Sequence, residues 1–283
     1  MKMEKIQLNK RRDFGQALNG VFTFLKTEYK DYFKGLFIVS LPLILLISIL
    51  DTFIYSDNPF AGFTLTTADD LLPTFTLLIV ILVYNFIISI YTLAYLKSYH
   101  NNLGEVNMNE VWRLTGKYFM PLVALYFIVG LLIFIGFVFF ILPGIYFLIA
   151  LSIAAPVRVF ESNDYRNPIS RSFTLIKDHW WQTFGGIFVI GIIIMVVQSL
   201  FSLPETILGF TEIFTNFSDS MSDQTIQTGT NPVVYFLITF FSYLGLMASG
   251  LQTIYITLQY FNLVEVKEAP GLVQKVDELT SES

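Results

Sequence analysis

Long apolar runs alternate with short polar stretches along the chain, and they predict helices that cross a membrane. Six runs approach or exceed the roughly 20 residues that a helix needs to span a bilayer. The third and fourth are separated only by Leu142-Pro143-Gly144, which predicts a tight hairpin turn. The sixth is longer than one hydrocarbon thickness requires, so we expect it to tilt or to extend beyond the bilayer. The predicted spans cover about residues 35–54, 74–97, 119–141, 143–160, 184–203 and 232–262.

Shorter segments with one apolar face precede the first, third and fifth spans. The third of these segments begins at Asn167-Pro168, a helix start signal, and the middle one carries Asn107 and Glu110 in the spacing of a capping box. Each segment is too polar to span, so we expect it to lie in the headgroup plane with its cations facing water. The apolar residues recur at helical spacing. They are Phe14, Leu18, Val21, Leu25 and Tyr29 in the first segment, and Ile169, Phe173, Ile176, Trp180 and Phe184 in the third.

Residues 22–37 and 173–188 align without a gap, which indicates an internal repeat. The lysine, threonine and glycine matches are the informative ones, because apolar matches are frequent in such a chain. A weaker copy precedes the third span, so the sequence predicts three repeats of an amphipathic helix followed by two spans. The identical pairs are Phe22/Phe173, Thr23/Thr174, Lys26/Lys177, Phe33/Phe184, Gly35/Gly186 and Phe37/Phe188.

The composition also favours an all-α integral membrane protein. Hydrophobic residues make up 54% of the 283 residues and charged residues 14%, whereas a soluble domain has about 25% charged residues. The absence of cysteine excludes disulfides, thiolate nucleophiles and cysteine-ligated metal sites. The net charge of −5 argues against nucleic acid as a partner, because nucleic acid favours a basic face.

The basic residues divide the predicted loops into two classes. All 17 Lys and Arg residues lie before the first span, or at or beyond the ends of the second, fourth and sixth. Segments 55–73 and 204–231 carry only acidic charges. Because basic residues concentrate in cytoplasmic loops, we expect both termini to be cytoplasmic. The N-terminus lacks the pattern of a cleaved signal peptide, so we expect the first span to direct insertion. One membrane domain would then cover residues 1–263, followed by a short, acidic, disordered cytoplasmic tail over 264–283.

Few residues offer catalytic chemistry. Neither His100 nor His179 has a second metal ligand three or four positions away, so both are interpreted as structural or solvated. Nucleotide-binding loops and hydrolase signatures are also missing from the sequence. The sequence therefore predicts no catalytic residue, no cofactor and no metal.

Neutral polar residues within the predicted spans allow two interpretations. The favoured one is hydrogen bonding between helices, and the other is a polar cavity for a lipid headgroup or a solute. Asn85, Gln198 and Gln252 are the main candidates for lining such a cavity. The others are Ser89, Ser199, Ser249 and Thr253.

Several short motifs carry a resemblance to a known family. They are Leu142-Pro-Gly-Ile-Tyr146, Ala154-Ala-Pro-Val157, Glu161, and Arg171-Ser-Phe followed by Trp180-Trp-Gln-Thr-Phe-Gly185. With them the chain resembles the membrane-domain family of glycerophosphoryl diester phosphodiesterases and the related YciC-like bacterial membrane proteins. In that family the phosphodiesterase activity belongs to a separate soluble barrel, for which this chain has no room. The resemblance therefore implies a bacterial six-span membrane protein of undetermined activity, without a catalytic residue.

These features lead to two functional hypotheses. The first is a non-enzymatic protein of the bacterial cytoplasmic membrane, a scaffold or accessory subunit that contacts lipids or another membrane protein. Its candidate docking face is Arg171, Lys177, His179, Trp180 and Trp181. The alternative is a transporter or permease for a small or lipid-like solute, which would use Asn85, Gln198 and Gln252.

Overall fold

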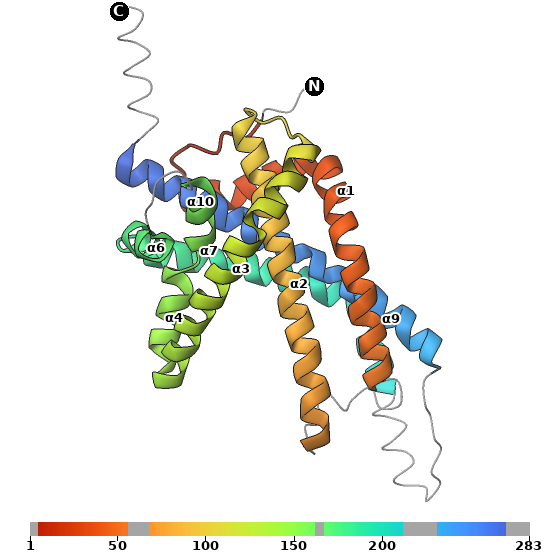
Figure 1. The fold of residues 1–283 in the computed structure, drawn as a ribbon. Helices are drawn as coiled ribbons and strands as arrows, with labels where there is room; N and C mark the ends of the chain where they lie inside the picture. Colours follow the sequence, from red (N-terminus) through yellow and green to blue (C-terminus); the bar gives the residue numbers. More distant parts are fainter. Residues whose placement is uncertain (1–4, 56–67, 162–166, 212–230, 270–283) are drawn as a thin grey trace, which may run out of the picture. The chain divides into compact units, whose positions relative to one another are not determined.

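The structure is a computed structural model that describes residues 5–55, 68–161, 167–211 and 231–269. Within these residues it is helical and has no β-strand, which confirms the predicted all-α class (Figure 1). The helices are α1 (Phe14–Tyr55), α2 (Ala68–Asn101), α3 (Met108–Phe139), α4 (Ile141–Ala150), α5 (Ala154–Phe160), α6 (Pro168–Ile176), α7 (Trp180–Phe201), α9 (Pro232–Leu244), the 3₁₀ helix η1 (Gly245–Ser249) and α10 (Gly250–Glu268).

Six helical stretches of the described chain are long and apolar enough to cross a membrane. Large hydrophobic side chains remain outside the protein core along these stretches. Phe53, Phe127 and Leu142 are 85%, 73% and 79% exposed. A water-soluble surface does not carry apolar area on this scale, so a bilayer is the environment that these helices fit.

The chain forms two compact units. Unit 1 comprises residues 1–35, 89–192 and 250–283, and unit 2 comprises residues 36–88 and 193–249. Helices α1, α2 and α7 each contribute residues to both units.

An aromatic cluster forms much of the core of unit 1. The Tyr91 hydroxyl donates to the Tyr32 carbonyl at 3.0 Å, and the Tyr95 hydroxyl donates to the Glu28 carboxylate at 3.0 Å. The rings meet mainly edge to face, an arrangement that aromatic pairs prefer. The buried members are Phe24, Tyr32, Tyr91, Tyr95 and Tyr99.

Unit 2 has a smaller core in which Tyr55, Leu77 and Tyr235 are buried together. The Tyr55 hydroxyl is hydrogen-bonded to the Thr74 hydroxyl at 2.7 Å. This contact joins the end of α1 to the start of α2.

The first two amphipathic segments are not helices separate from their spans, as the predicted repeat would require. The first continues into its span as α1, and the middle one continues into its span as α3. Only the third is a separate helix, α6, which ends at Ile176 before a turn that leads into α7. Asp178 in this turn pairs with Lys267 of α10, whereas Thr27 of α1 stays helical and bonds back to the Thr23 carbonyl. Thr27 and Asp178 occupy aligned positions, and only Asp178, where the helix is broken, forms an ion pair with another helix.

The buried face of the start of α1 also differs from the predicted apolar face. Phe14 and Tyr29 are exposed, whereas Val21 is the one predicted position that is fully buried. The buried stripe is Ala17, Val21, Phe24 and Tyr32. Hydrophobicity alone marked both the exposed and the core-facing residues, so it could not separate the two faces.

The hairpin between α3 and α4 turns earlier than predicted. Phe140 alone has extended backbone between the two helices, and Pro143 and Gly144 lie inside the first turn of α4. Proline is tolerated there because the first helical N–H groups have no acceptor within the helix. A Cβ on Gly144 would overlap the Phe137 ring, so this glycine permits close packing of α4 on α3 rather than the turn.

The sixth predicted span is interrupted rather than continuous. The 3₁₀ segment η1 separates α9 from α10, and Gly245 and Gly250, both weak helix formers, stand at its start and just after its end. Helix α10 then continues to Glu268, so residues 264–268 are helical and not part of a disordered tail. Residues 270–283 of that predicted tail lie outside the described residues.

Candidate functional site

Charged side chains of unit 1 join the ends of its helices, and the first such group is centred on Arg171 of α6. The Arg171 Nε lies 3.1 Å from both carboxylate oxygens of Glu161, and an Nη lies 2.7 Å from Glu268 of α10. The side chains of Arg171 and Glu161 are only 9% and 12% exposed. The Tyr260 hydroxyl also donates to Glu161 at 3.1 Å. We call Arg171, Glu161, Glu268 and Tyr260 the Arg171 clamp.

The electrostatics of the Arg171 clamp favour a charged guanidinium. Burial alone would lower the pKa of Arg171, but the hydrogen bonds and charges of Glu268 and Glu161 raise it above its ordinary value. The positive charge of Arg171 is therefore paired with Glu161 and Glu268 inside the protein.

The local sequence explains how Arg171 is positioned. The Asn167 side chain accepts from the Ile169 N–H at 3.0 Å and caps α6, with Pro168 at the first helical position. Lys267 of α10 donates to the Thr174 carbonyl at 2.6 Å and to Asp178 at 3.2 Å. These contacts hold the C-terminal end of α10 on α6.

The predicted docking residues do not form one exposed face. Arg171 is enclosed in the clamp and Lys177 is exposed. His179 is half-buried, and its buried Nδ1 atom has no hydrogen-bond partner within the described chain.

The two tryptophans of this segment also differ in how far they are exposed. Trp180 is stacked nearly parallel on Tyr146 and on Phe184, with centroid distances of 6.3 Å and 5.3 Å. Trp181 is 77% exposed. Of the five predicted docking residues, Lys177 and Trp181 are thus the two that remain accessible.

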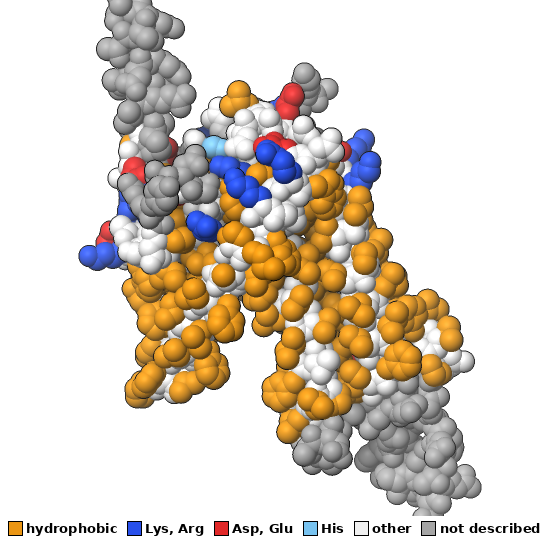
Figure 2. Space-filling view, in the orientation of Figure 1, with side chains coloured by type: hydrophobic (Ala, Val, Ile, Leu, Met, Phe, Trp, Pro, Cys, Tyr) orange, Lys and Arg blue, Asp and Glu red, His pale blue; other side chains and the backbone are white. Residues whose placement is uncertain are grey.

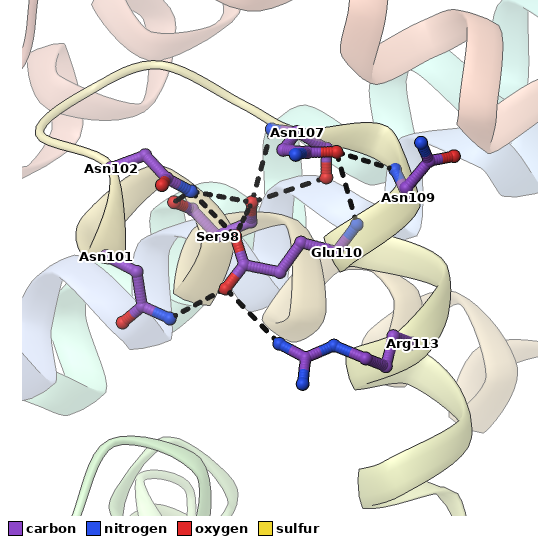
Figure 3. A network of polar contacts seen from close by, with 7 residues as sticks. All are labelled: Ser98, Asn101, Asn102, Asn107, Asn109, Glu110 and Arg113. Carbon is purple, nitrogen blue, oxygen red and sulfur yellow. Dashed lines mark hydrogen bonds and ion pairs between the residues drawn. The ribbon is translucent and has the colours of Figure 1, made fainter.

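A second polar group, drawn in Figure 3, joins the end of α2 to the start of α3 through Glu110. Its carboxylate accepts from Ser98 at 2.8 Å, Asn101 at 3.0 Å and Asn102 at 2.6 Å. Arg113 lies 4.0 Å away from it. This carboxylate is therefore satisfied by the end of the preceding helix.

The predicted capping box at this place is only half formed. The Asn107 side chain accepts from the N–H groups of Asn109 and Glu110, as an N-cap should. The Asn107 N–H, however, donates to Ser98 at 3.3 Å rather than to the Glu110 carboxylate.

A third polar group ties the N-terminal segment to α10 and α7. The Arg12 N–H donates to Asn262 at 2.7 Å, Asn262 donates to Gln259 at 3.4 Å, and Gln259 donates to Thr183 at 3.1 Å. The Arg12 guanidinium donates to nearby carbonyl groups, among them that of Leu8 at 2.8 Å. Burial lowers the pKa of Arg12 from its ordinary value.

A small cleft of about 120 Å³ lies near these groups. His100, interpreted from sequence as a residue at a helix end, lies at the end of α2 and stacks on Phe261 with a centroid distance of 5.2 Å. The Lys97 ammonium lies over the Phe160 ring, 5.1 Å from its centroid. The cleft is lined by Asn9, His100, Phe160, Tyr260, Phe261, Val264 and Glu265. Sequence reasoning missed the cleft because its residues come from four separate segments.

The predicted intramembrane residues are half-buried and are not all in one unit. Asn85 and Gln198 belong to unit 2 and Gln252 to unit 1. The Asn85 side chain donates at 2.8 Å to the Ile81 carbonyl of its own helix. This bond satisfies one polar group of Asn85 without any cavity.

Two of the other neutral residues do hydrogen-bond between helices. Ser89 of α2 accepts from Thr253 of α10 at 3.2 Å and is bonded to the Tyr126 hydroxyl of α3 at 2.6 Å. For Ser89 and Thr253, the favoured interpretation of interhelical hydrogen bonding is confirmed.

The polar groups and the cleft described above are formed by residues of unit 1, and their contacts are ion pairs, hydrogen bonds and aromatic packing. Within the described residues no group of three or more His, Asp or Glu side chains could hold a metal ion.

Comparisons with known proteins found no family model, no curated protein and no solved structure that matches the chain. The family resemblance proposed from short motifs therefore stays a prediction.

Proposed function

We propose that this chain is a non-enzymatic protein of the bacterial cytoplasmic membrane, with both termini on the cytoplasmic side, and that it is a scaffold or accessory subunit. One observation carries this proposal. All 17 Lys and Arg residues belong to unit 1, and unit 2 contains none. The units are defined by packing alone, yet one of them holds every basic residue. Basic residues concentrate on the cytoplasmic side of bacterial membrane proteins, which favours this orientation for both termini.

Several carboxylates of unit 1 form contacts within the protein, which supports a structural role. The carboxylates of Glu161, Glu110 and Glu268 lie in contacts that hold helix ends together. Exposed Lys177 and Trp181 are left to contact lipid headgroups or a membrane partner. Both residue types are favoured at the membrane–water interface.

Shared contacts support the proposed repeat. Gly35 and Gly186 are aligned in the first and third copies, and each receives the hydroxyl end of a tyrosine from another helix, Tyr91 and Tyr255 respectively. Thr23 and Thr174, also aligned, both donate to the carbonyl four residues earlier. A common ancestor of the two segments would explain both correspondences.

Cysteine labelling tests the orientation, and the natural chain needs no prior change because it has no cysteine. Ser218→Cys should react with a membrane-impermeant maleimide added outside spheroplasts. Lys177→Cys should react only after the membrane is permeabilised. The cysteine-free protein provides the background. Labelling of Lys177→Cys in intact spheroplasts would overturn the orientation.

Co-purification in mild detergent tests the scaffold role. A partner protein or a distinct lipid should remain with the wild-type chain and be lost from the Lys177→Glu, Trp181→Ala double variant. The matched control is Lys26→Glu with Tyr29→Ala, because Lys26 is aligned with Lys177, Tyr29 is next to the residue aligned with Trp181, and both are exposed. Wild-type protein that retains no partner and no lipid beyond the bulk composition would contradict the proposal.

A further inference from the structure

The exposed face of α3 changes from basic to apolar along its length. Lys117 is exposed near the N-terminal end, and large apolar side chains follow it at helical spacing. Figure 2 shows Lys and Arg side chains over the start of α3 and an almost continuous hydrophobic surface along the rest of α3 and along α4. Below Lys117 the exposed residues are Met120 at 72%, Phe127 at 73%, Leu131 at 50%, Phe134 at 64% and Val138 at 66%.

Lys97 of α2 and Lys117 of α3 approach the same end of α5. The Lys117 ammonium lies 5.5 Å from the centroid of the Tyr118 ring, and the Tyr118 hydroxyl donates at 3.3 Å to the carbonyl of Val159, next to the Phe160 that Lys97 contacts. Lys97 is half-buried, and its ammonium lies over the Phe160 ring. Among the described residues, neither Lys97 nor Lys117 has a carboxylate within ion-pair distance. By contrast, Arg171, Lys267 and Lys5 are all paired.

An anion bound by both ammonium groups would offset their positive charge. A phosphate group suits the place because lysine binds it as a compact point charge with three donors. Trp112, 37% exposed on the same end of α3, is a residue typical of headgroup depth. Lys97 lies four residues before the end of its candidate span. The span of α3 has 32 residues, more than the roughly 20 that cross a bilayer, so Lys117 in its first third fits the level of a lipid phosphate.

We propose that Lys97 and Lys117 bind the phosphate of an anionic phospholipid whose acyl chains lie along the exposed apolar face of α3. This inference rests on the membrane placement in the proposed function but not on the scaffold role. An anionic lipid is favoured over a zwitterionic one, because a choline or ethanolamine group would return a positive charge to a site that already has two.

Lipid retention measures the site directly. Purified protein is delipidated, exposed to equal amounts of palmitoyl-oleoyl phosphatidylglycerol and phosphatidylcholine in detergent, and analysed by native mass spectrometry. Wild-type protein should retain phosphatidylglycerol preferentially. Because one basic residue near a membrane surface contributes about a fivefold change in binding, Lys97→Gln and Lys117→Gln should each weaken retention by about fivefold, and the double variant by roughly 25-fold.

Lys30→Gln is the matched control, since Lys30 is an exposed lysine of α1 that also lacks an ion pair within the described chain. It should retain phosphatidylglycerol like the wild type. Equal losses in Lys30→Gln and Lys117→Gln would indicate general attraction to a basic surface and would overturn the site. Equal retention of both lipids by the wild type would also overturn it.

Two further arms complete the test. Soluble glycerol 1-phosphate at the same concentration should fail to displace the lipid, because it lacks the acyl chains; efficient displacement would mean that the site binds a free phosphate compound instead.

Lys97→Gln removes a contact with Phe160, so its melting temperature is compared with that of the wild type. The exposed Lys117→Gln decides the outcome if Lys97→Gln unfolds. Neither result depends on the orientation of the chain, so failure here leaves the cysteine-labelling result unaffected.

Discussion

At the scale of single residues, the closest packing in unit 1 is between glycine and tyrosine. A Cβ on Gly186 would overlap the Tyr255 hydroxyl and ring, and a Cβ on Gly35 would overlap the Tyr91 hydroxyl. Helices in membranes commonly use small residues where they approach each other. Tyr255 is fully buried, and its hydroxyl has no hydrogen-bond partner in the described chain, so at this position shape matters more than polarity.

Gly186→Ala should lower the free energy of unfolding by about 2–3 kcal/mol, because the new methyl group overpacks a closed contact. Gly191→Ala in the same helix should be neutral or stabilise by up to about 1 kcal/mol, since nothing lies within 4 Å of its Cβ and alanine favours helix. Thermal melting in detergent distinguishes the two. In the double variant Gly186→Ala, Tyr255→Ala the overlap is removed. Its loss of unfolding free energy should therefore be smaller than the sum of the two single losses. If both glycine variants melt alike, the Tyr255 contact is not restrictive.

Glu205 gives a prediction about pH. Burial raises the pKa of this half-buried carboxyl above its usual range. Its contribution to stability is therefore fully present below the unfolded-state pKa and is lost as the pH rises through the folded-state pKa. The melting temperature of the wild type should fall as the pH is raised from the acid range, and Glu205→Gln should make this fall smaller. Glu105→Gln, at an exposed side chain, should leave the profile as it is in the wild type.

At the scale of helices, periodicity and start signals predicted much of the fold. The all-α class, the six apolar stretches and the start at Asn167 follow from local sequence, because span length and helix caps depend on neighbouring residues. The interruptions do not follow in this way. The sequence pattern placed the turn at Leu142-Pro143-Gly144 rather than at Phe140 and showed no break over 245–249, and the enclosure of Arg171 depends on Glu268, far away in the sequence.

The Arg171 clamp makes the end of α10 dependent on α6. Arg171→Leu leaves Glu161 buried without its cation, so unfolding should become easier by about 3–5 kcal/mol. The end of α10 should also loosen, and limited digestion with trypsin should cleave faster after Lys267. Lys177→Leu, at an exposed lysine beyond the end of the same helix, should change neither quantity. Unchanged cleavage in Arg171→Leu would mean that the clamp does not hold α10.

At the scale of the whole molecule, packing and charge divide the chain in the same way. Unit 2 contains acidic residues but no basic ones, and the ion pairs found in the described chain all lie in unit 1. The division of charge was visible in the sequence, whereas the two units required the structure.

Adding cations to unit 2 should disturb the insertion of the chain. Thr206→Lys with Thr211→Lys places two basic residues in an exposed segment that has none. Because basic residues are retained on the cytoplasmic side, part of the population should insert wrongly. Combined with Ser218→Cys, the double lysine variant should be labelled less by an impermeant maleimide in intact spheroplasts. Thr206→Gln with Thr211→Gln should be labelled fully; equal labelling of both would contradict the expectation.

The glycine–tyrosine contacts also constrain how this sequence can diverge. A larger residue at position 35 or 186 is tolerated only if the facing tyrosine, Tyr91 or Tyr255, becomes smaller, so each pair should change together or not at all. In an alignment of homologues we expect these two pairs of columns to covary. If the segments arose by duplication, both pairs should be traceable to a single ancestral pair.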